Sequence, residues 1–344
     1  MHRSVWIIDR TEATGRLGMV VAQHELAAEV GVTVLADGGN AIDAAVATAF
    51  TIGVVEPFMS GIGGGGLMLV YLAETQETVA IDFGMCAPLA ARPDLYALLP
   101  GTSATRFGWR AVEGDANVHG PLAIAVPGAV AGLVTALERY GTRPLAELLQ
   151  PAIRLARDGF PVSWHTSLEM AQDAALLARY PSTRAIFTRD GLPLPVQTGL
   201  EPTILRQPDL ARSLEAIARE GSDTFYRGEL GRQLVEGLRD LGALLTMEDL
   251  ERYTVRLSAP LWGEYRGYRI AVAPAPSGGP TVLEALHLLA CFPLAEYGHN
   301  SSRTLHILIE AFRQAFVDRF AYLADPAFVP VPVAGLTDPA YARE

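Results

Sequence analysis

Histidines, cysteines and one run of glycines are the residues of this 344-residue chain whose types and spacing could do chemistry. The seven histidines lie at positions 2, 24, 119, 165, 287, 299 and 306. No two of them are four residues apart, so the paired-histidine spacing of a metal site is absent. No Gly-x-Ser-x-Gly sequence marks a serine nucleophile. We therefore expect neither a bound metal nor a serine triad.

The glycine run covers residues 61–66 and reads GIGGGG. It matches the dinucleotide-binding pattern G-x-G-x-x-G, which functions only when it follows a strand and opens a helix. Here a helical pattern precedes the run and a strand pattern follows it, and no Gly-Lys-Ser/Thr sequence completes a phosphate loop. We expect no nucleotide site. The glycines are predicted instead to let two backbones approach closely or to let the loop adopt positive φ.

The composition excludes several classes of function. All 27 basic residues are arginine, so chemistry that needs a lysine, such as a Schiff base or the anchoring of pyridoxal phosphate, is ruled out. The 38 acidic residues leave a formal charge of −11, and a nucleic-acid binder needs the opposite balance to neutralise phosphates. Half of the residues are hydrophobic and 19% are charged, which is typical of a globular fold rather than of disorder.

The two cysteines, Cys86 and Cys291, are too few for a disulfide scaffold or for a structural zinc site of their own. Cys86 follows a predicted strand, where a nucleophile could sit, although a single cysteine is more often a small buried hydrophobic residue. The first ten residues lack the apolar core of a secretory signal, and the most apolar stretch, residues 41–55, is shorter than a membrane span. We expect a cytoplasmic protein without nucleic-acid or membrane partners.

Hydrophobic periodicity predicts the elements that must position these residues. Residues 17–22 are rich in branched side chains, as strands are, and a helix is expected over residues 24–35. Asn40 and Asp43 resemble an N-cap with its acidic third residue, ahead of a helix over residues 41–54 that is apolar nearly all round. The glycine run leads into a predicted antiparallel hairpin with strands at 67–72 and 78–83.

The rest of the chain is predicted to be mainly helical. Residues 98–120 have no clear period and are expected to form a long loop. Apolar spacings of three and four predict helices over residues 129–140, 145–158, 167–179, 208–220, 229–241, 247–252, 281–291 and 302–324. Residues 262–273 alternate as a strand does. No internal repeat or linker divides the chain, so we expect a single α+β domain over residues 1–344.

Several segments resemble the large subunit of the γ-glutamyltranspeptidases, and they occur in the same order. These are residues 18–22, 38–47, 61–69, 126–132, 140–142, 156–160, 265–268, 274–279, 323–326 and 335–338. Each segment alone is a weak signal, but as a set they are specific. The resemblance covers essentially the whole chain.

The resemblance implies an N-terminal nucleophile hydrolase, a four-layer αββα sandwich made as one precursor that cleaves itself. A separate small subunit that begins with threonine would complete the helix-rich large subunit. That threonine attacks an amide with its hydroxyl group, uses its own α-amine as the base, and passes the acyl group to water or to an acceptor amine. No catalytic residue and no cofactor are then expected in this chain, which would form one wall of the pocket; a dimer of heterodimers is compatible with this.

Family members specific for γ-glutamyl groups carry Asp-Phe/Tyr-Arg-Glu after the second hairpin strand, and the arginine binds the α-carboxylate of the substrate. This sequence has Gly84 in the arginine position and Met85 in the glutamate position. Loss of such a buried charge pair costs on the order of 2–5 kcal/mol in recognition. Arg106 or Arg110, from the predicted loop, could replace it. Gly84, Met85, Arg106 and Arg110 are therefore the predicted substrate-binding residues.

The function predicted from these residues is that of an acylase-like amidohydrolase or acyltransferase, similar to the cephalosporin (glutaryl) acylases, with a small-molecule amide as substrate. A γ-glutamyltransferase or glutathione hydrolase with a substitute arginine is the first alternative. A non-catalytic binding or scaffolding subunit is the second, and it applies if the partner lacks its N-terminal threonine. The sequence around Gly84 is explained equally well by a loop that is merely remodelled.

Overall fold

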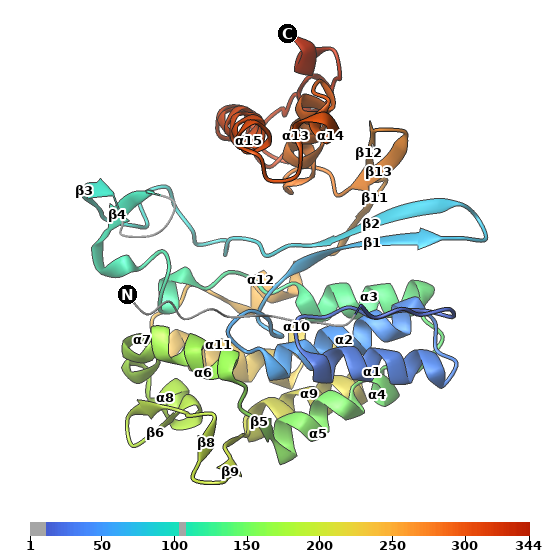
Figure 1. Cartoon of the computed structure of the whole chain (residues 1–344). Helices are drawn as coiled ribbons and strands as arrows, with labels where there is room; N and C mark the ends of the chain where they lie inside the picture. Colours follow the sequence, from blue (N-terminus) through green and yellow to red (C-terminus); the bar gives the residue numbers. More distant parts are fainter. Residues whose placement is uncertain (1–11, 103–107) are drawn as a thin grey trace, which may run out of the picture. The chain divides into compact units, whose positions relative to one another are not determined.

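The computed structural model describes residues 12–102 and 108–344, and the chain groups into two compact units. The first unit consists of Met1–Ile62, Leu89–Ile124 and Leu133–Glu251, and the second of Gly63–Pro88, Ala125–Gly132 and Arg252–Glu344. The chain therefore passes between the units several times (Figure 1). This grouping does not decide between one domain and two, and the single domain over residues 1–344 stays a prediction.

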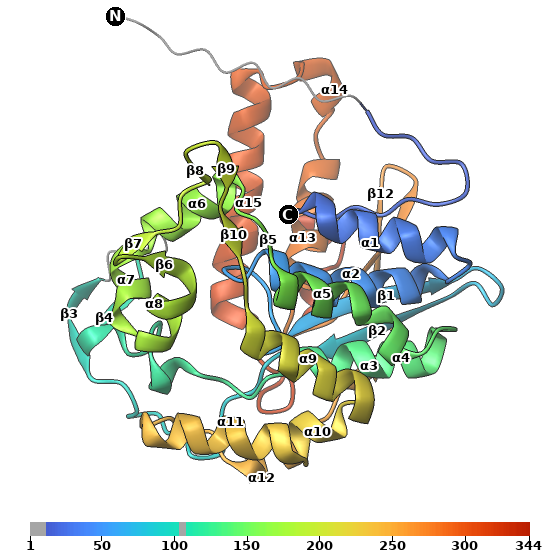
Figure 2. The ribbon, with the colours of Figure 1, turned by 90° about the horizontal axis from the view of Figure 1, so that it is seen from below.

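The first unit is mainly helical. Its helices are α1 (Glu25–Ala36), α2 (Ala41–Val55), α4 (Leu145–Leu148), α5 (Gln150–Asp158), α6 (Trp164–Gln172), α7 (Ala174–Arg179), α8 (Pro181–Phe187), α9 (Pro208–Glu220), α10 (Asp223–Tyr226), α11 (Glu229–Asp240) and α12 (Met247–Glu251). Helix α3 (Ala129–Tyr140) begins in the second unit and ends in the first. Helix α2 packs against both α1 and α5, and α5 packs against α9 (Figure 2).

Short strands of the first unit pair two by two. The antiparallel pairs are β3 (Leu98–Thr102) with β4 (Arg110–Val112), β5 (Phe160–Pro161) with β10 (Ile204–Leu205), β6 (Thr188–Arg189) with β7 (Leu192–Pro193), and β8 (Gln197–Thr198) with β9 (Glu201–Pro202). Among the described residues, no helix is long and apolar enough to cross a membrane.

Helix α2 forms the buried centre of the first unit, because it is apolar on nearly every face and nine of its residues are buried. Its sequence is AIDAAVATAFTIGVV. Small residues let its neighbours come close. A Cβ atom added to Gly31 of α1 would collide with the side chain of Thr48. A Cβ atom added to Gly53 would lie 3.1 Å from the Cα atom of Gly61, the first residue of the glycine run.

The predicted capping box at the start of α2 is confirmed. The Asn40 side chain accepts hydrogen bonds from the backbone N–H groups of Ile42 and Asp43, and the Asp43 carboxylate accepts the Asn40 backbone N–H at 2.8 Å. The same carboxylate, fully buried, also accepts the Thr142 N–H (2.8 Å), the Thr142 hydroxyl (2.6 Å) and the Arg143 N–H (3.1 Å). It therefore fastens the start of α2 to the loop after α3.

The second unit contains a three-stranded antiparallel sheet in the order β1 (Gly66–Leu72), β2 (Glu77–Phe83), β11 (Arg256–Ser258). In its register Gly66 lies opposite Phe83, and Asp82 lies opposite both Leu67 and Arg256. A second hairpin pairs β12 (Leu261–Tyr265) with β13 (Tyr268–Val272). The helices are α13 (Gly279–Ala290), α14 (Leu294–Tyr297), α15 (Ser302–Tyr322) and α16 (Val333–Leu336).

A pair of buried carboxyl groups joins α13 to α15. Burial raises the pKa of Glu284 on α13 to about 8, and the hydrogen bond to Asp318 on α15 acts in the same direction. Glu284 is therefore protonated at neutral pH and donates to the Asp318 carboxylate. Asp318 also accepts the Tyr341 hydroxyl at 2.9 Å and the Gln314 amide at 3.0 Å.

Several sequence predictions were wrong in detail. Residues 17–22 form no strand, because they lie along α1, where Val20 meets Gly31 and Gly18 faces Leu35. Residues 262–273 form most of a hairpin instead of one strand, because Arg266 and Gly267 both adopt positive φ and reverse the chain. Residues 98–120 contain the β3–β4 pair, and two of the long predicted helices are interrupted, one between α4 and α5 and one between α6 and α7.

Replacement of Asp43 by asparagine is expected to lower the free energy of unfolding by about 2–4 kcal/mol at pH 7, since an amide cannot satisfy four donors. Burial would raise the pKa of Asp43, but the hydrogen bonds from Thr142, Asn40 and Arg143 outweigh it and the pKa is lowered. A lowered folded-state pKa contributes stability above the unfolded value of about 3.9 and loses it as the pH falls through the folded value.

The deficit of D43N should therefore shrink as the pH is reduced below about 4. Urea unfolding of the full-length protein that contains this chain, at pH 7 and at pH 3.5, measures both quantities. The exposed Asp240 at the end of α11 supplies the control, because D240N should change the stability by less than about 0.5 kcal/mol. A pH-independent deficit in D43N would contradict the role assigned to the Asp43 carboxylate.

Candidate functional site

Gly84 and Met85 lie in the loop that leaves strand β2 of the second unit, directly after Phe83. The next residue, Cys86, forms an isolated antiparallel bridge with Val126: the Val126 N–H donates to the Cys86 carbonyl at 2.8 Å, and the Cys86 N–H returns the bond at 3.3 Å. The Gly84 carbonyl accepts the Tyr253 hydroxyl at 2.9 Å. The loop is thus fixed from two sides by backbone and side-chain hydrogen bonds.

Phe83 is enclosed by glycines from two distant segments. A Cβ atom at Gly66 would lie 2.7 Å from the Phe83 ring, and one at Gly132, in the first turn of α3, would overlap that ring. At Gly65 it would lie 2.7 Å from the Phe83 carbonyl oxygen and 2.9 Å from the Met85 nitrogen. A Cβ atom at Gly128 would collide with the Phe83 carbonyl oxygen and with the Tyr253 hydroxyl.

The backbone of the glycine run also binds the start of α3. The Gly64 carbonyl accepts the N–H groups of both Gly128 and Ala129, at 2.8 and 2.9 Å. The prediction that these glycines allow backbones to approach closely is therefore confirmed. None of the glycines at positions 61, 63, 64, 65 and 66 has a positive φ, so close packing rather than left-handed backbone explains Gly65 and Gly66, whereas a Cβ atom at Gly61 or Gly63 would meet nothing within 4 Å.

Asp82 connects the loop to the neighbouring strand. Its Oδ1 atom accepts the Gly84 N–H at 2.8 Å, and its Oδ2 atom accepts an N–H of the Arg256 guanidinium at 2.9 Å. Arg256 stands directly opposite Asp82 in the sheet, and its Nη1 atom lies 3.7 Å from the carboxylate of Asp325. The Asp82 side chain is 14% exposed and that of Arg256 is 48% exposed, so the aspartate is mostly shielded while the guanidinium reaches solvent.

Residue 84 could carry a side chain. Its backbone has no positive φ, and a Cβ atom there would come within 4 Å of a single atom, the Oδ1 of Asp82 at 3.1 Å. The neighbouring residue, Met85, has 56% of its surface exposed. The local backbone therefore does not require glycine at position 84, whereas close contacts do require it at positions 65 and 66.

Cys86 lies within electrostatic range of the same charges. Partial burial raises the pKa of its thiol; Arg256 opposes this shift, while Asp325 and Asp82 add to it. The thiol is therefore protonated at neutral pH, which makes it a poor nucleophile. Both cysteines are free and exposed.

Within the described part of the chain, no contact places Arg110 beside Gly84. Arg110 is the first residue of β4, is exposed and belongs to the first unit, whereas Gly84 and Met85 belong to the second. Arg106 lies outside the described residues. That one of them replaces the missing arginine stays a prediction.

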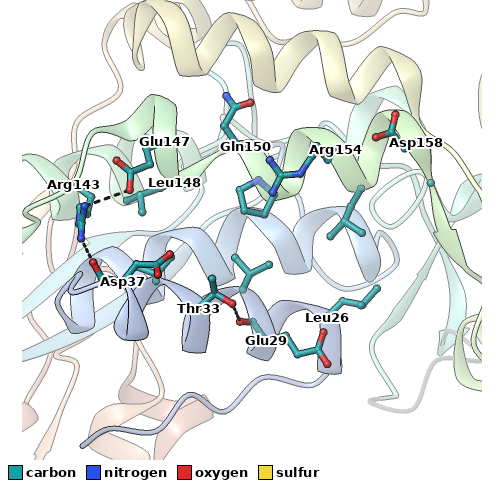
Figure 3. Close-up of a pocket in the computed structure, with 15 residues that line it drawn as sticks. Leu26, Glu29, Thr33, Asp37, Arg143, Glu147, Leu148, Gln150, Arg154 and Asp158 are labelled. Carbon is teal, nitrogen blue, oxygen red and sulfur yellow. Dashed lines mark hydrogen bonds and ion pairs between the residues drawn. The ribbon is translucent and has the colours of Figure 1, made fainter.

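A cavity of about 620 Å³ lies in the first unit between α1 and the α4–α5 segment (Figure 3). Leu26 and Leu148 are among the apolar residues that line it, and the guanidinium of Arg143 is already engaged by Glu147 and the Asp37 carbonyl. None of the predicted site residues lines it. Within residues 12–102 and 108–344, no group of three histidine, cysteine, aspartate or glutamate side chains could hold a metal ion.

The sequence profile of the gamma-glutamyltranspeptidase family matches residues 27–344. The chain belongs to this family. A glutathione hydrolase proenzyme of Bacillus subtilis (strain 168) is 40% identical over 331 residues, which are 96% of this chain and 54% of that protein. An acylase ACY 1 proenzyme of Pseudomonas sp. (strain V22) is 44% identical over 337 residues, or 98% of this chain and 59% of that protein. The chain spans little more than half the length of these relatives.

Solved structures of the family agree with the fold. The γ-glutamyltranspeptidase of Helicobacter pylori matches with a TM-score of 0.87 at 35% identity, covering 97% of this chain and 92% of that chain. A cephalosporin acylase from Bacillus halodurans matches with a TM-score of 0.77 at 30% identity, covering 92% of this chain and 57% of that chain. The predicted family and the mixed helix-and-sheet fold of the N-terminal nucleophile hydrolases are therefore confirmed.

Arg256 is the residue of this transpeptidase-family site that the sequence patterns did not indicate. It lies 174 positions from Asp82 in a strand of only three residues, too short for a period-2 signal. Only the register of β11 against β2 brings the two side chains together.

Two glycines of the same run should respond oppositely to alanine. G65A is expected to lower the free energy of unfolding by about 2–4 kcal/mol, because its methyl group would press on the backbone at Phe83 and Met85. G63A meets nothing within 4 Å and should leave stability unchanged or raise it by up to about 1 kcal/mol. Thermal melting of both variants of the full-length protein makes the comparison; equal effects would refute close packing as the reason for Gly65.

Proposed function

We propose that this chain is part of an amide-cleaving enzyme whose nucleophile is the N-terminal threonine of a second chain from the same precursor. The threonine hydroxyl attacks the amide carbon, the amine leaves with a proton, and water or an acceptor amine then takes the acyl group from the ester. Support comes from the family and from the relatives named proenzymes, of which this chain covers 54–59%. In this proposal the present chain shapes the acyl pocket and does not perform the chemistry.

The acyl group is proposed to lack an α-amino-acid head, as in an acylase. The observation that carries this is Gly84, which supplies no cation where γ-glutamyl-specific members have arginine. Met85 likewise supplies no acceptor where they have glutamate, and it points outward as an apolar side chain. An ammonium group on the acyl chain would lack the acceptor that this glutamate supplies, which is unfavourable once water is removed from it.

Glutathione hydrolysis is the second candidate, favoured by the 40% identity to the Bacillus subtilis glutathione hydrolase proenzyme. It requires a cation to replace the arginine absent at position 84, and Arg106 or Arg110 would have to provide it. The two candidates differ in whether an α-amino group on the acyl chain helps or hinders turnover.

A partner chain is supported by the surface of α15. Ile309, Phe312, Phe316 and Phe320 follow one another at helical spacing, and their exposed fractions are 62, 50, 47 and 75%. An apolar stripe of this length is typical of a surface that another polypeptide covers. We propose that the remainder of the precursor covers it.

The acyl preference can be measured with two p-nitroanilides that differ only in the α-amino group. The full-length processed enzyme is expected to hydrolyse the glutaryl anilide with a kcat/KM at least about tenfold above that for the γ-glutamyl anilide, because the ammonium group finds no acceptor. R110A and R106A test the second candidate, and each should change the ratio less than about threefold if neither arginine replaces the missing one. Efficient γ-glutamyl turnover with transfer to dipeptide acceptors would contradict the acylase assignment.

The two-chain organisation predicts a definite composition of the purified protein. Intact mass and N-terminal sequencing should show this chain together with a smaller one that begins with threonine, since self-cleavage must expose the nucleophile. A single stable chain without such a partner would favour a non-catalytic binding subunit instead.

A further inference from the structure

The C-terminal segment, residues 338–344, lies against a pair of buried carboxyl groups in the second unit. Helices α13 and α15 pack against each other, and the 3₁₀ turn η3 (Tyr341–Arg343) packs on α13 (Figure 1). The Tyr341 hydroxyl donates to Oδ2 of Asp318 at 2.9 Å, and the Cys291 thiol donates to the Ala342 carbonyl at 3.5 Å. Both hydrogen bonds attach the segment to the helices, and the stronger one ends on the buried pair.

The pair consists of Glu284 on α13 and Asp318 on α15, and it lacks a counter-ion. The two residues are 2% and 4% exposed. Within residues 12–102 and 108–344, no cation acts on the pKa of either carboxyl group, and the Oε1 atom of Glu284 has no hydrogen-bond partner. A second negative charge in the covered pair would therefore be stabilised neither by water nor by a neighbouring cation.

A single proton keeps the two carboxyl groups together. Burial and the hydrogen bond to Asp318 raise the pKa of Glu284 to about 8. Burial alone would raise the pKa of its partner as well, but the hydrogen bonds from Glu284, Gln314 and Tyr341 outweigh it and that pKa is lowered. The proton therefore resides on Glu284, and the one charge on Asp318 is shared among three donors.

The elements packed against α13 carry other charged or titratable groups. They are Arg303, His306, Glu310, Arg313, Asp318, Arg319 and Tyr322 on α15, Glu264, Tyr265, Tyr268 and Arg269 on the β12–β13 hairpin, and Tyr341 and Arg343 on η3, whereas α16 carries none. Of these, Asp318 is the group that acts on Glu284.

His287, one turn after Glu284 on α13, is 6% exposed, and neither of its ring nitrogens has a hydrogen-bond partner among the described residues. An imidazolium buried there without an acceptor would favour opening of the structure as the pH falls. Ionisation of Glu284 favours opening as the pH rises. The direction of any pH effect therefore distinguishes the two residues.

We propose that Glu284 and Asp318 form a pH-sensitive clasp that holds residues 338–344 on α13 and α15 and releases them when Glu284 loses its proton. Release admits water to both carboxylates, which is the surrounding that a doubly charged pair prefers. The clasp goes beyond the proposed function, because it acts on the fold of this chain whichever amide the enzyme cleaves.

The pH range of the release follows from the proton on Glu284. In the open state this carboxyl group is hydrated, and its pKa returns to the ordinary value of about 4.3. The raised pKa of the closed state contributes stability that is fully present below that value and is lost as the pH rises through about 8. The equilibrium constant for opening should therefore increase by up to about tenfold per pH unit in this range and level off above it.

Hydrogen–deuterium exchange of the full-length processed protein tests the clasp. Protection factors, which correct for the intrinsic pH dependence of exchange, are measured for a peptide that covers residues 338–344. In the wild type they are expected to fall by about 30-fold or more between pH 5.5 and 8.5. Those of the buried helix α2 in the first unit should stay within about threefold.

Glu284→Gln removes the titrating group and keeps a donor of the same shape for Asp318. In this variant the protection of residues 338–344 should change by less than about threefold over the same pH range. The matched control is Glu310→Gln, at an exposed carboxylate of α15 that pairs with Arg313, and it should retain the wild-type fall.

Tyr341→Phe removes the hydroxyl group that joins the segment to Asp318. At pH 5.5 it should lower the protection of residues 338–344 by about fivefold or more and leave that of α13 unchanged, since one hydrogen bond is lost.

Several results would overturn the clasp: protection that does not change with pH in the wild type, protection that falls as the pH is lowered, or an equal fall in E284Q and the wild type. If E284Q disturbs the packing of α13, Y341F still decides the question. Unchanged protection of residues 338–344 in Y341F would show that Tyr341 does not hold the segment.

Discussion

The close approach of three backbone segments at Phe83 is the constraint on which the second unit depends. Phe83 ends strand β2, and the glycine run and the start of α3 come so near to it that Cβ atoms at Gly65, Gly66, Gly128 or Gly132 would overlap it or press on it. Two N–H groups at the start of α3 are satisfied by the Gly64 carbonyl. Because these contacts fix the end of β2, they also fix the direction in which the next residues leave the sheet.

The Asp82 carboxylate links the end of β2 to the guanidinium of Arg256 on the adjacent strand. A carboxylate can accept several hydrogen bonds, and Asp82 uses one oxygen for the loop backbone and the other for a guanidinium on the adjacent strand. Cross-strand pairing is what brings this cation beside the loop. This protein has the arginine on the strand and glycine on the loop.

In the first unit, too, one carboxylate accepts hydrogen bonds from segments that lie far apart in the sequence. Asp43 is fully buried, and its carboxylate gathers donors from Asn40, Thr142 and Arg143. Four of the segments through which the sequence resembles the transpeptidase family meet in two pairs: the Asn40–Asp43 cap meets the loop at Thr142, and the glycine run meets the start of α3. These short-range motifs, each weak by itself, are thus partners across the fold.

The sequence by itself determined the elements whose signals are local. The helices over residues 129–140 and 208–220, the hairpin before Phe83 and the capping box at Asn40 follow from periodicity and from hydrogen bonds three residues apart, and the family follows from motif order. Tertiary structure alone decided the rest. Residues 17–22 have strand composition but pack along a helix, and Arg256 reaches Asp82 only through a register set across 174 positions. A local pattern records what one segment can form, whereas the identity of its neighbour depends on competition among all segments for the same contacts.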